Sequence, residues 1–239
     1  VVYANNLPFV KFPIADILKS FIPVKKVLVE NDANAAAKGE AVAGAAKGVA
    51  DAVMITLGTG VGGGIIIDHK VYAGFNYAGA ELGHIVIEHN GRQCSCGRRG
   101  CWEAYSSATG LINMTKEKLD ECKEKGIPTL MTKLVEEEGK VSGKTAFAAM
   151  KQGDAPAKEV VDMYISYLGC GLSNIINIFQ PEILDIGGGI CNEKHYLTDP
   201  LEVIIKQETY GNEAIKPTTL KIAELGNDAG IIGAAVLGL

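Results

Sequence analysis

Apolar residues along the chain form two kinds of pattern. Short runs rich in Val, Ile and Leu, bounded by glycine or polar residues, are typical of buried strands, and longer segments with helical spacing are typical of helices. The strands expected from the first pattern are 25–30, 52–57, 65–67, 70–72, 84–88, 183–186 and 219–224. The helices expected from the second pattern are 14–21, 33–47, 102–125, 144–152, 156–179, 196–210 and 231–237. Because strands and helices alternate, the sequence predicts an α/β sheet.

Asn31 and Asp32 stand between a predicted strand and an alanine-rich predicted helix. Asp is a favoured N-cap residue, so one interpretation of Asp32 is the start of that helix. A carboxylate at a strand-to-helix junction also lies where the active sites of α/β proteins gather. The two interpretations are compatible, and the sequence leaves both open.

A glycine-rich loop, Gly58 to Gly64, joins two predicted strands. Its glycines match the spacing G-x-G-x-x-G, but a dinucleotide-binding fingerprint must open a helix, and a β-branched run follows here. The loop also lacks the Lys-Ser/Thr of a P-loop. Two interpretations remain. The backbone N–H groups cradle phosphate, with the Thr59 hydroxyl as a further donor, or the glycines serve a tight hairpin that needs positive φ.

One histidine and three cysteines lie within a short stretch: His84, Cys94, Cys96 and Cys101. Imidazole nitrogen and thiolate sulfur are the ligands of closed, tetrahedral zinc sites, and four protein ligands leave no open position for a reacting water. The sequence therefore predicts a structural zinc ion. The alternative is a core histidine beside idle thiols.

The composition excludes some classes of protein. The 239 residues are 47% hydrophobic and 21% charged, with a formal net charge of -5, which is ordinary for a soluble globular protein. An acidic chain lacks the basic footprint of a nucleic-acid partner, and no apolar run reaches the length of a membrane span. Six unevenly clustered cysteines favour a metal site in a reducing compartment over a disulfide scaffold, so we expect a cytoplasmic protein.

Taken together these motifs resemble the ROK family, which contains sugar kinases and sugar-responsive repressors. The stretches that carry the resemblance follow the family's order, at 30–36, 57–64, 80–84, 94–103 and 187–189. The resemblance runs from about Asn5 to the C-terminus. It implies an actin-like, RNase H-like fold of two lobes, with sugar and ATP meeting between them. Residues 1–50 would be a partial N-terminal lobe, and 51–239 the C-terminal lobe with an inserted zinc loop at 84–103.

The resemblance also implies roles for single residues. The family's catalytic base falls on Asp32, and one zinc ligand, His84, also belongs to the sugar site. The implied sugar ligands are Asn31, Asp32, Glu81, His84 and Glu103. The implied ATP-binding residues are Gly58, Thr59, Gly60 and Gly62 on the phosphate side and Gly187, Gly188 and Gly189 on the adenosine side. Mg²⁺ would arrive with ATP.

The sequence departs from the family at two places. Family members open with a phosphate loop of the form Asp-x-Gly-Gly-Thr, and nothing like it precedes the matching motifs here. Since the chain also begins at Val1 without an initiator Met, we expect a fragment that keeps zinc by itself but has no useful kinase activity. The second departure is Asp185, an acid in a predicted strand that is otherwise apolar. The sequence suggests no role for it.

The expected activity is ATP-dependent phosphorylation of a hexose, with glucose and its 6-phosphate as the first choice. A sugar hydroxyl is a poor nucleophile, and a carboxylate at Asp32 can accept its proton as it attacks the γ-phosphate. Fructose, mannose and N-acetylmannosamine remain alternative substrates. Two other classes stay open: a sugar-responsive repressor, for which no helix-turn-helix is visible, and a zinc-stabilised interaction module without catalysis. We expect the kinase to act as a homodimer.

Overall fold

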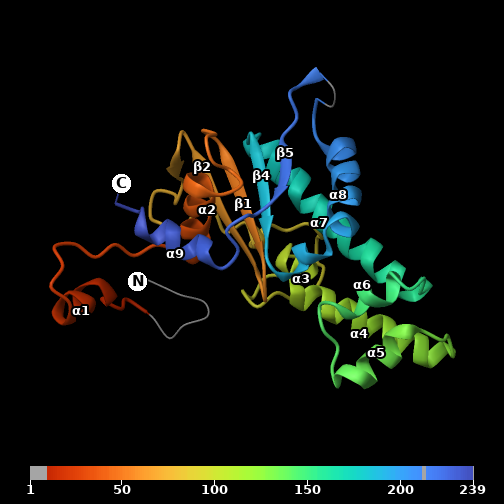
Figure 1. The fold of residues 1–239 in the computed structure, drawn as a ribbon. Coiled ribbons are helices and arrows are strands. Elements are labelled where there is room, and N and C mark those ends of the chain that lie inside the picture. The colour runs from red at the N-terminus through yellow and green to blue at the C-terminus, as the bar shows by residue number, and fades with distance from the viewer. Residues whose placement is uncertain (1–9, 212–213, 239) are drawn as a thin grey trace.

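The computed structural model describes residues 10–211 and 214–238, and the first nine residues of the predicted N-terminal lobe lie outside this range. The centre of the fold is a five-stranded sheet in the order β3-β2-β1-β4-β5 (Figure 1). The strands are β1 Ala52–Leu57, β2 Val61–Ile67, β3 Lys70–Val71, β4 Ile183–Gly187 and β5 Thr219–Ile222. β1 and β2 form an antiparallel hairpin, whereas β4 and β5 run parallel to β1. The carboxyl ends of these three parallel strands therefore meet at one edge of the sheet.

Helices supply the connections between the strands. The α-helices are α1 Ile14–Phe21, α2 Asp32–Ala43, α3 Glu103–Ser106, α4 Ala108–Lys125, α5 Leu130–Glu138, α6 Thr145–Met150, α7 Ala155–Phe179, α8 His195–Glu208 and α9 Asp228–Ala235. Two short 3₁₀ helices are η1 Leu82–His84 and η2 Gly189–Glu193. None of the helices in the described part of the chain is long and apolar enough to cross a membrane.

Both faces of the sheet are covered by helices, as parallel strands require. α2 and α9 lie on one face, and α7 and α8 lie on the other (Figure 1). The side chains of β1 alternate between the two layers, because successive residues of a strand point to opposite faces. Met54 belongs to the core beneath α2 and α9, whereas Val53 and Ile55 belong to the core beneath α7. The predicted α/β sheet is confirmed.

Small residues let α2 pack very closely against α9 and against the sheet. A Cβ added to Gly39 would overlap the carbonyl oxygen of Ala229, and one added to Gly233 would overlap that of Ala35. The first turn of α2 also lies on β2, since Ala33 would touch a Cβ on Gly62. These contacts fix the N-terminus of α2 at the carboxyl edge of the sheet. The predicted lobe boundary at residue 50 stays a prediction, although α2 shares a core with the sheet that follows it.

The opposite layer is organised around Trp102, which is fully buried. Its indole N–H donates to the carbonyl oxygen of Tyr167 at 3.0 Å, and the ring lies where a side chain on Gly171 would stand. The buried hydroxyl of Tyr164 donates to the carbonyl oxygen of Ser106 at 2.9 Å. Both hydrogen bonds join α7 to the short helix α3 or its N-cap. The backbone of Glu103, the first residue of α3, is therefore held in a fixed position.

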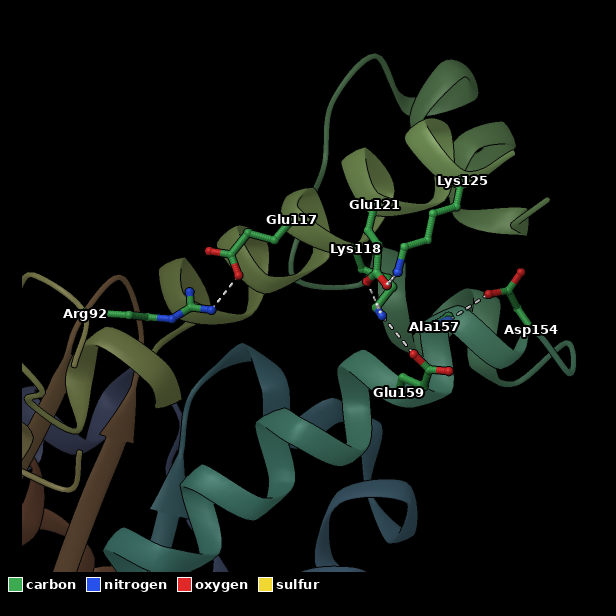
Figure 2. A network of polar contacts seen from close by, with 8 residues as sticks. All are labelled: Arg92, Glu117, Lys118, Glu121, Lys125, Asp154, Ala157 and Glu159. Atoms are coloured by element: carbon green, nitrogen blue, oxygen red, sulfur yellow. Dashed lines mark hydrogen bonds and ion pairs between the residues drawn. The ribbon is translucent and has the colours of Figure 1, made fainter. Parts of the chain in front are cut away.

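Ion pairs connect the outer helices, as Figure 2 shows. Lys118 of α4 lies 2.5 Å from Glu121 and 2.8 Å from Glu159 of α7, and Lys125 lies 2.7 Å from Glu121. Hydrogen bonds from Lys118 and Lys125 lower the pKa of Glu121 to about 2. Lys125 and Glu159 are exposed, and Lys118 and Glu121 are only partly buried, so we assign these ion pairs to surface organisation rather than to stability.

Two predicted strands are wrong. Residues 25–30 form neither a helix nor a strand, are largely exposed, and pair with no strand within the described residues. Residues 84–88 begin in the 3₁₀ helix η1 and form only an isolated bridge between Val86 and Cys101. An apolar run is a local signal, whereas a strand needs a neighbour that accepts and donates its backbone hydrogen bonds.

Several element boundaries also differ from the prediction. The helix expected over 102–125 is divided at Ser107, whose backbone is extended (φ -77°, ψ 166°) and whose side chain caps α4. α2 ends at Ala43 rather than at residue 47, and β2 begins at Val61 rather than at residue 65. α5 was not predicted, although Thr129 and Gly139 supply its N-cap and C-cap. The remaining predicted helices and strands are confirmed to within a few residues.

Candidate active site and metal site

The glycine loop forms the tip of the β1–β2 hairpin. Thr59 and Gly58 are exposed, and the Gly58 N–H donates to the carbonyl oxygen of Gly60 at 3.0 Å. None of Gly58 to Gly64 has the left-handed backbone that only glycine favours, so the interpretation as a positive-φ turn is wrong. The glycines instead make room for neighbours, because a side chain on Gly64 would overlap Ala37 and one on Gly63 would collide with Leu82.

The start of α4 supports this hairpin tip from one side. The Ala108 N–H donates to the carbonyl oxygen of Gly58 at 2.9 Å, and the Thr109 hydroxyl donates to that of Thr59 at 2.8 Å. These two hydrogen bonds use carbonyl oxygens of the hairpin tip and none of its N–H groups. The N–H groups of Thr59 and Gly60 therefore stay available at the tip. Neither donates to another described residue.

The N-terminus of α2 carries the predicted catalytic pair. Asn31 is the N-cap, since its side-chain oxygen accepts from the N–H groups of Ala33 at 2.9 Å and Asn34 at 3.1 Å. The interpretation of Asp32 as the N-cap is therefore wrong. Asp32 is exposed in the first helical turn, and its Oδ1 also accepts from the Ala33 N–H at 2.9 Å. A carboxylate at this position is stabilised by the helix dipole.

Glu81 and His84 lie on the turn that contains η1, close to the hairpin. Glu81 is exposed, and its carbonyl oxygen accepts from the His84 N–H at 3.0 Å. Gly83 sits so near the start of β2 that a Cβ there would overlap the carbonyl oxygen of Val61. The structure thus brings the predicted Glu-x-x-His turn beside the predicted phosphate loop.

Glu103, at the start of α3, reaches both the hairpin and the cysteine loop. Its Oε2 accepts from the Val61 N–H at 3.0 Å, and its Oε1 accepts from the Ser95 hydroxyl at 3.1 Å. Sequence reasoning gave Ser95 and Thr109 no role. The available signals were a hydroxyl between two candidate metal ligands and a threonine in the first turn of a helix.

The ligand atoms of His84, Cys94, Cys96 and Cys101 all lie within 4.8 Å of one another. Cys96 Sγ is 3.7 Å from Cys101 Sγ, and Cys94 Sγ is 3.7 Å from His84 Nδ1. In a tetrahedral site with Zn–S bonds of about 2.3 Å, two sulfurs lie about 3.8 Å apart. The cluster therefore fits a zinc ion, and use of Nδ1 by the metal leaves Nε2 of His84 for another ligand.

Two buried thiols of the cluster resist ionisation, since burial raises the pKa of Cys94 and of Cys101. Burial, together with the neighbouring Cys96 and Cys94 thiols, raises the pKa of Cys101 to about 12. A bound cation reverses this balance, because it stabilises the thiolate. Outside the cluster, Arg92 ties the loop to α4 through Glu117 at 2.5 Å (Figure 2).

The glycines after β4 lie at the same sheet edge as the hairpin. Gly187 is in parallel register with Thr56, next to the end of β1. Gly188 has φ 116°, and a Cβ there would overlap the carbonyl oxygen of Leu57. Only glycine meets both conditions. The candidate phosphate and adenosine segments are therefore neighbours.

Comparison with known proteins identifies the family. The family model described as ROK family matches residues 1–239, so the chain belongs to the ROK family. A glucokinase of Halalkalibacterium halodurans is 39% identical over 237 residues, which cover 98% of this chain and 69% of that protein. A xylose repressor of Bacillus spizizenii is 34% identical over 196 residues, covering 81% of this chain and 46% of the repressor.

A solved structure agrees with the sequence comparison. The ROK family glucokinase from Streptomyces griseus, in complex with glucose and AMPPNP, superposes with a TM-score of 0.85 at 35% identity. The match covers 99% of this chain and 75% of that one. The actin-like ATPase fold of ROK sugar kinases is therefore confirmed for this chain.

Proposed function

We propose that the protein is an ATP-dependent hexose kinase that converts glucose to glucose 6-phosphate. The observation that carries this proposal is the meeting of four elements at one sheet edge: the α2 N-terminus, the hairpin tip, the Glu81–His84 turn and Glu103. Carboxylates for sugar hydroxyls and free N–H groups for phosphate are then in one place. Similarity to the Halalkalibacterium halodurans and Streptomyces griseus glucokinases supports the same activity.

Asp32 is the proposed catalytic base. Its exposed carboxylate can accept the proton of the attacking sugar hydroxyl, which makes that oxygen a better nucleophile. Asn31 is a proposed sugar ligand through its amide N–H, because its side-chain oxygen is already used to cap α2. Glu81, Glu103 and Nε2 of His84 complete the proposed sugar site.

ATP is proposed to bind along the same edge. At the hairpin the best phosphate donors are the N–H groups of Thr59 and Gly60 and the Thr59 hydroxyl. Gly58 contributes shape rather than a donor, since its N–H is bonded to Gly60, and Gly62 lies inside β2. Gly187 to Gly189 approach the adenosine side. Mg²⁺ carried by ATP would neutralise the phosphate charge, and most of the rate would come from alignment of donor and acceptor.

A structural zinc is proposed for His84, Cys94, Cys96 and Cys101, where it would join the Glu81–His84 turn to the loop that leads into Glu103. We expect one zinc ion per chain by elemental analysis. Cys96→Ala should weaken zinc binding by at least about tenfold and lower the thermal midpoint, because ligand binding is coupled to folding of the loop. Cys170→Ala, at a cysteine outside the cluster, is the control. Zinc-free protein with four unprotected ligands would contradict the proposal.

The substrate is tested on the full-length protein with a coupled assay for ADP release. Glucose, mannose, fructose and N-acetylmannosamine are compared at equal concentrations. We expect kcat/KM for glucose to exceed that for each other sugar by about tenfold or more, since a misplaced hydroxyl leaves a polar group of the site without its hydrogen bond. A different preferred hexose corrects the substrate and keeps the kinase. No turnover with any sugar, combined with sugar-dependent DNA binding, would replace the kinase by a repressor.

A further inference from the structure

The carboxylate of Glu103 is held from two sides by groups far apart in the sequence. On one side the Val61 N–H, the first amide of β2, donates to Oε2 at 3.0 Å. On the other side the Ser95 hydroxyl, between two cysteines of the candidate metal site, donates to Oε1 at 3.1 Å. We call this arrangement of Val61, Glu103 and Ser95 the Glu103 clasp.

The backbone next to the clasp is shaped to admit it. A Cβ on Gly60 would overlap Oε2 of Glu103, and Gly60 does not have a left-handed backbone. Space for the Glu103 carboxylate is therefore a sufficient reason for glycine at this position. This is a second observation for the clasp, independent of the two hydrogen bonds.

The clasp leaves part of the carboxylate unused. Two oxygens offer about four acceptor sites. Oε2 accepts from Val61, whereas Oε1 accepts from Ser95 and also from the Cys94 thiol at 3.8 Å. Oε2 therefore keeps a lone pair, to which a sugar hydroxyl can donate. Rotation of the carboxylate away from this orientation would break the hydrogen bond from Val61 or the one from Ser95. Its orientation is therefore set before the sugar arrives, which lowers the entropic cost of binding.

We propose that Ser95 is a positioning residue that orients Glu103 for the sugar, and that the Glu103 clasp couples sugar binding to the phosphate hairpin. The inference rests on the proposed kinase function. The physical link is short, since Val61 directly follows Gly60, whose N–H is a proposed phosphate donor. A sugar that holds Glu103 in place also holds Val61, and a phosphate on Gly60 holds the same backbone from the other end. Each ligand should therefore raise the affinity of the other by the same factor.

The test measures binding in full-length Ser95→Ala, Ser95→Thr and wild-type protein. Glucose and a non-hydrolysable ATP analogue are titrated separately and then in the presence of each other. Ser95→Ala should weaken glucose binding about fivefold, the effect of one lost net hydrogen bond. It should also bring the factor by which glucose and nucleotide raise each other's affinity close to one. Zinc content and thermal midpoint should stay unchanged. Ser95→Thr, which keeps the hydroxyl, should restore both values.

Controls separate this inference from its alternatives. Ser20→Ala removes an exposed hydroxyl on α1 that bonds only to the backbone within the described residues and should change nothing. Gly60→Ala, which displaces Glu103, should reproduce both losses. Wild-type behaviour of Ser95→Ala, loss of zinc from it, or failure of Ser95→Thr to rescue would each overturn the positioning role. Failure of the proposed function has a different signature, because the wild-type protein itself would then bind no hexose and phosphorylate none.

Discussion

Asp32→Asn is expected to lower kcat for glucose phosphorylation about a thousandfold and to leave the glucose affinity within about threefold, since positioned general bases typically contribute 10²–10⁴ in rate. Asn has the same shape as Asp and still accepts the hydrogen bond that Oδ1 receives from the Ala33 N–H. It cannot accept a proton from the sugar. Helix α2 should keep its start, because the N-cap is Asn31 and not Asp32.

The measurement pairs a coupled ADP-release assay with glucose titration by calorimetry in the full-length protein. Asp120→Asn, at an exposed carboxylate on α4, is the matched control and should leave both kcat and affinity unchanged. A kcat near that of the wild type would reduce Asp32 to a residue that complements the helix dipole. A parallel loss of kcat and glucose affinity would make it a sugar ligand without a role as base.

Local sequence patterns were sufficient to predict those helices and strands whose boundaries and burial are visible in the sequence itself. β1 and β4 are mainly apolar runs, as buried parallel strands are, with Thr56 the exception in β1 and Asp185 in β4, and both stand where the sequence predicted them. The long helix α7 was also predictable, with Pro156 in its first turn and Pro181 beyond its end. Residues 25–30 carry the same kind of apolar run but are largely exposed. What separates the two cases is a pairing partner, which no local pattern contains.

The residues of the candidate site likewise fall into those that the sequence could predict and those that it could not. The four metal ligands were recognisable because few other reasons bring three cysteines and a histidine together, and their atoms do converge. The Glu103 clasp was not recognisable, because Val61 and Ser95 meet only through the folding of β2 and the cysteine loop. The glycines of the hairpin illustrate a third case. Their presence was visible, but the reason for them, close packing rather than positive φ, required the neighbours.

Asp185, which the sequence left without a role, lies at the centre of the sheet between Met54 and Lys221. It is 1% exposed, and neither carboxylate oxygen has a hydrogen-bond partner within the described residues. Its side chain points to the α2 and α9 face, because Leu184 and Ile186 on either side belong to the opposite core. Burial, with the nearby Glu40 carboxylate, raises the pKa of Asp185 to about 7, and Lys221 opposes that rise.

The two charged neighbours are engaged elsewhere. Glu40 is fully buried and accepts from the backbone N–H groups of Ala45, Glu224 and Leu225 at 2.7, 3.1 and 2.8 Å. The Lys221 ammonium donates to the carbonyl oxygen of Ala45 at 2.9 Å. An ionised Asp185 would therefore stand beside another carboxylate without a hydrogen bond of its own, which is why the folded state favours its protonated form.

The sign of the resulting pH dependence follows from linkage. The pKa of Asp185 is about 7 in the folded state against an ordinary value of 3.8. Between these values the folded protein binds the proton more strongly than the unfolded chain, so this residue's contribution to stability falls as the pH rises. The loss is complete above the folded pKa, where it reaches about 4 kcal/mol as an order of magnitude.

Asp185→Asn is accordingly expected to be more stable than the wild type at neutral and alkaline pH, and the difference should grow with pH. An unpaired buried amide carries its own cost, but that cost does not depend on pH. Between about pH 5 and about pH 8 the difference in free energy of unfolding should increase by about 3 kcal/mol in favour of Asp185→Asn. Titration of the cysteine cluster is common to both proteins and cancels in the difference. Urea unfolding across this range measures it, with Asp120→Asn as the control. A difference that stays flat with pH would mean that Asp185 is already ionised in the folded protein, and that the apolar strand accommodates a buried charge.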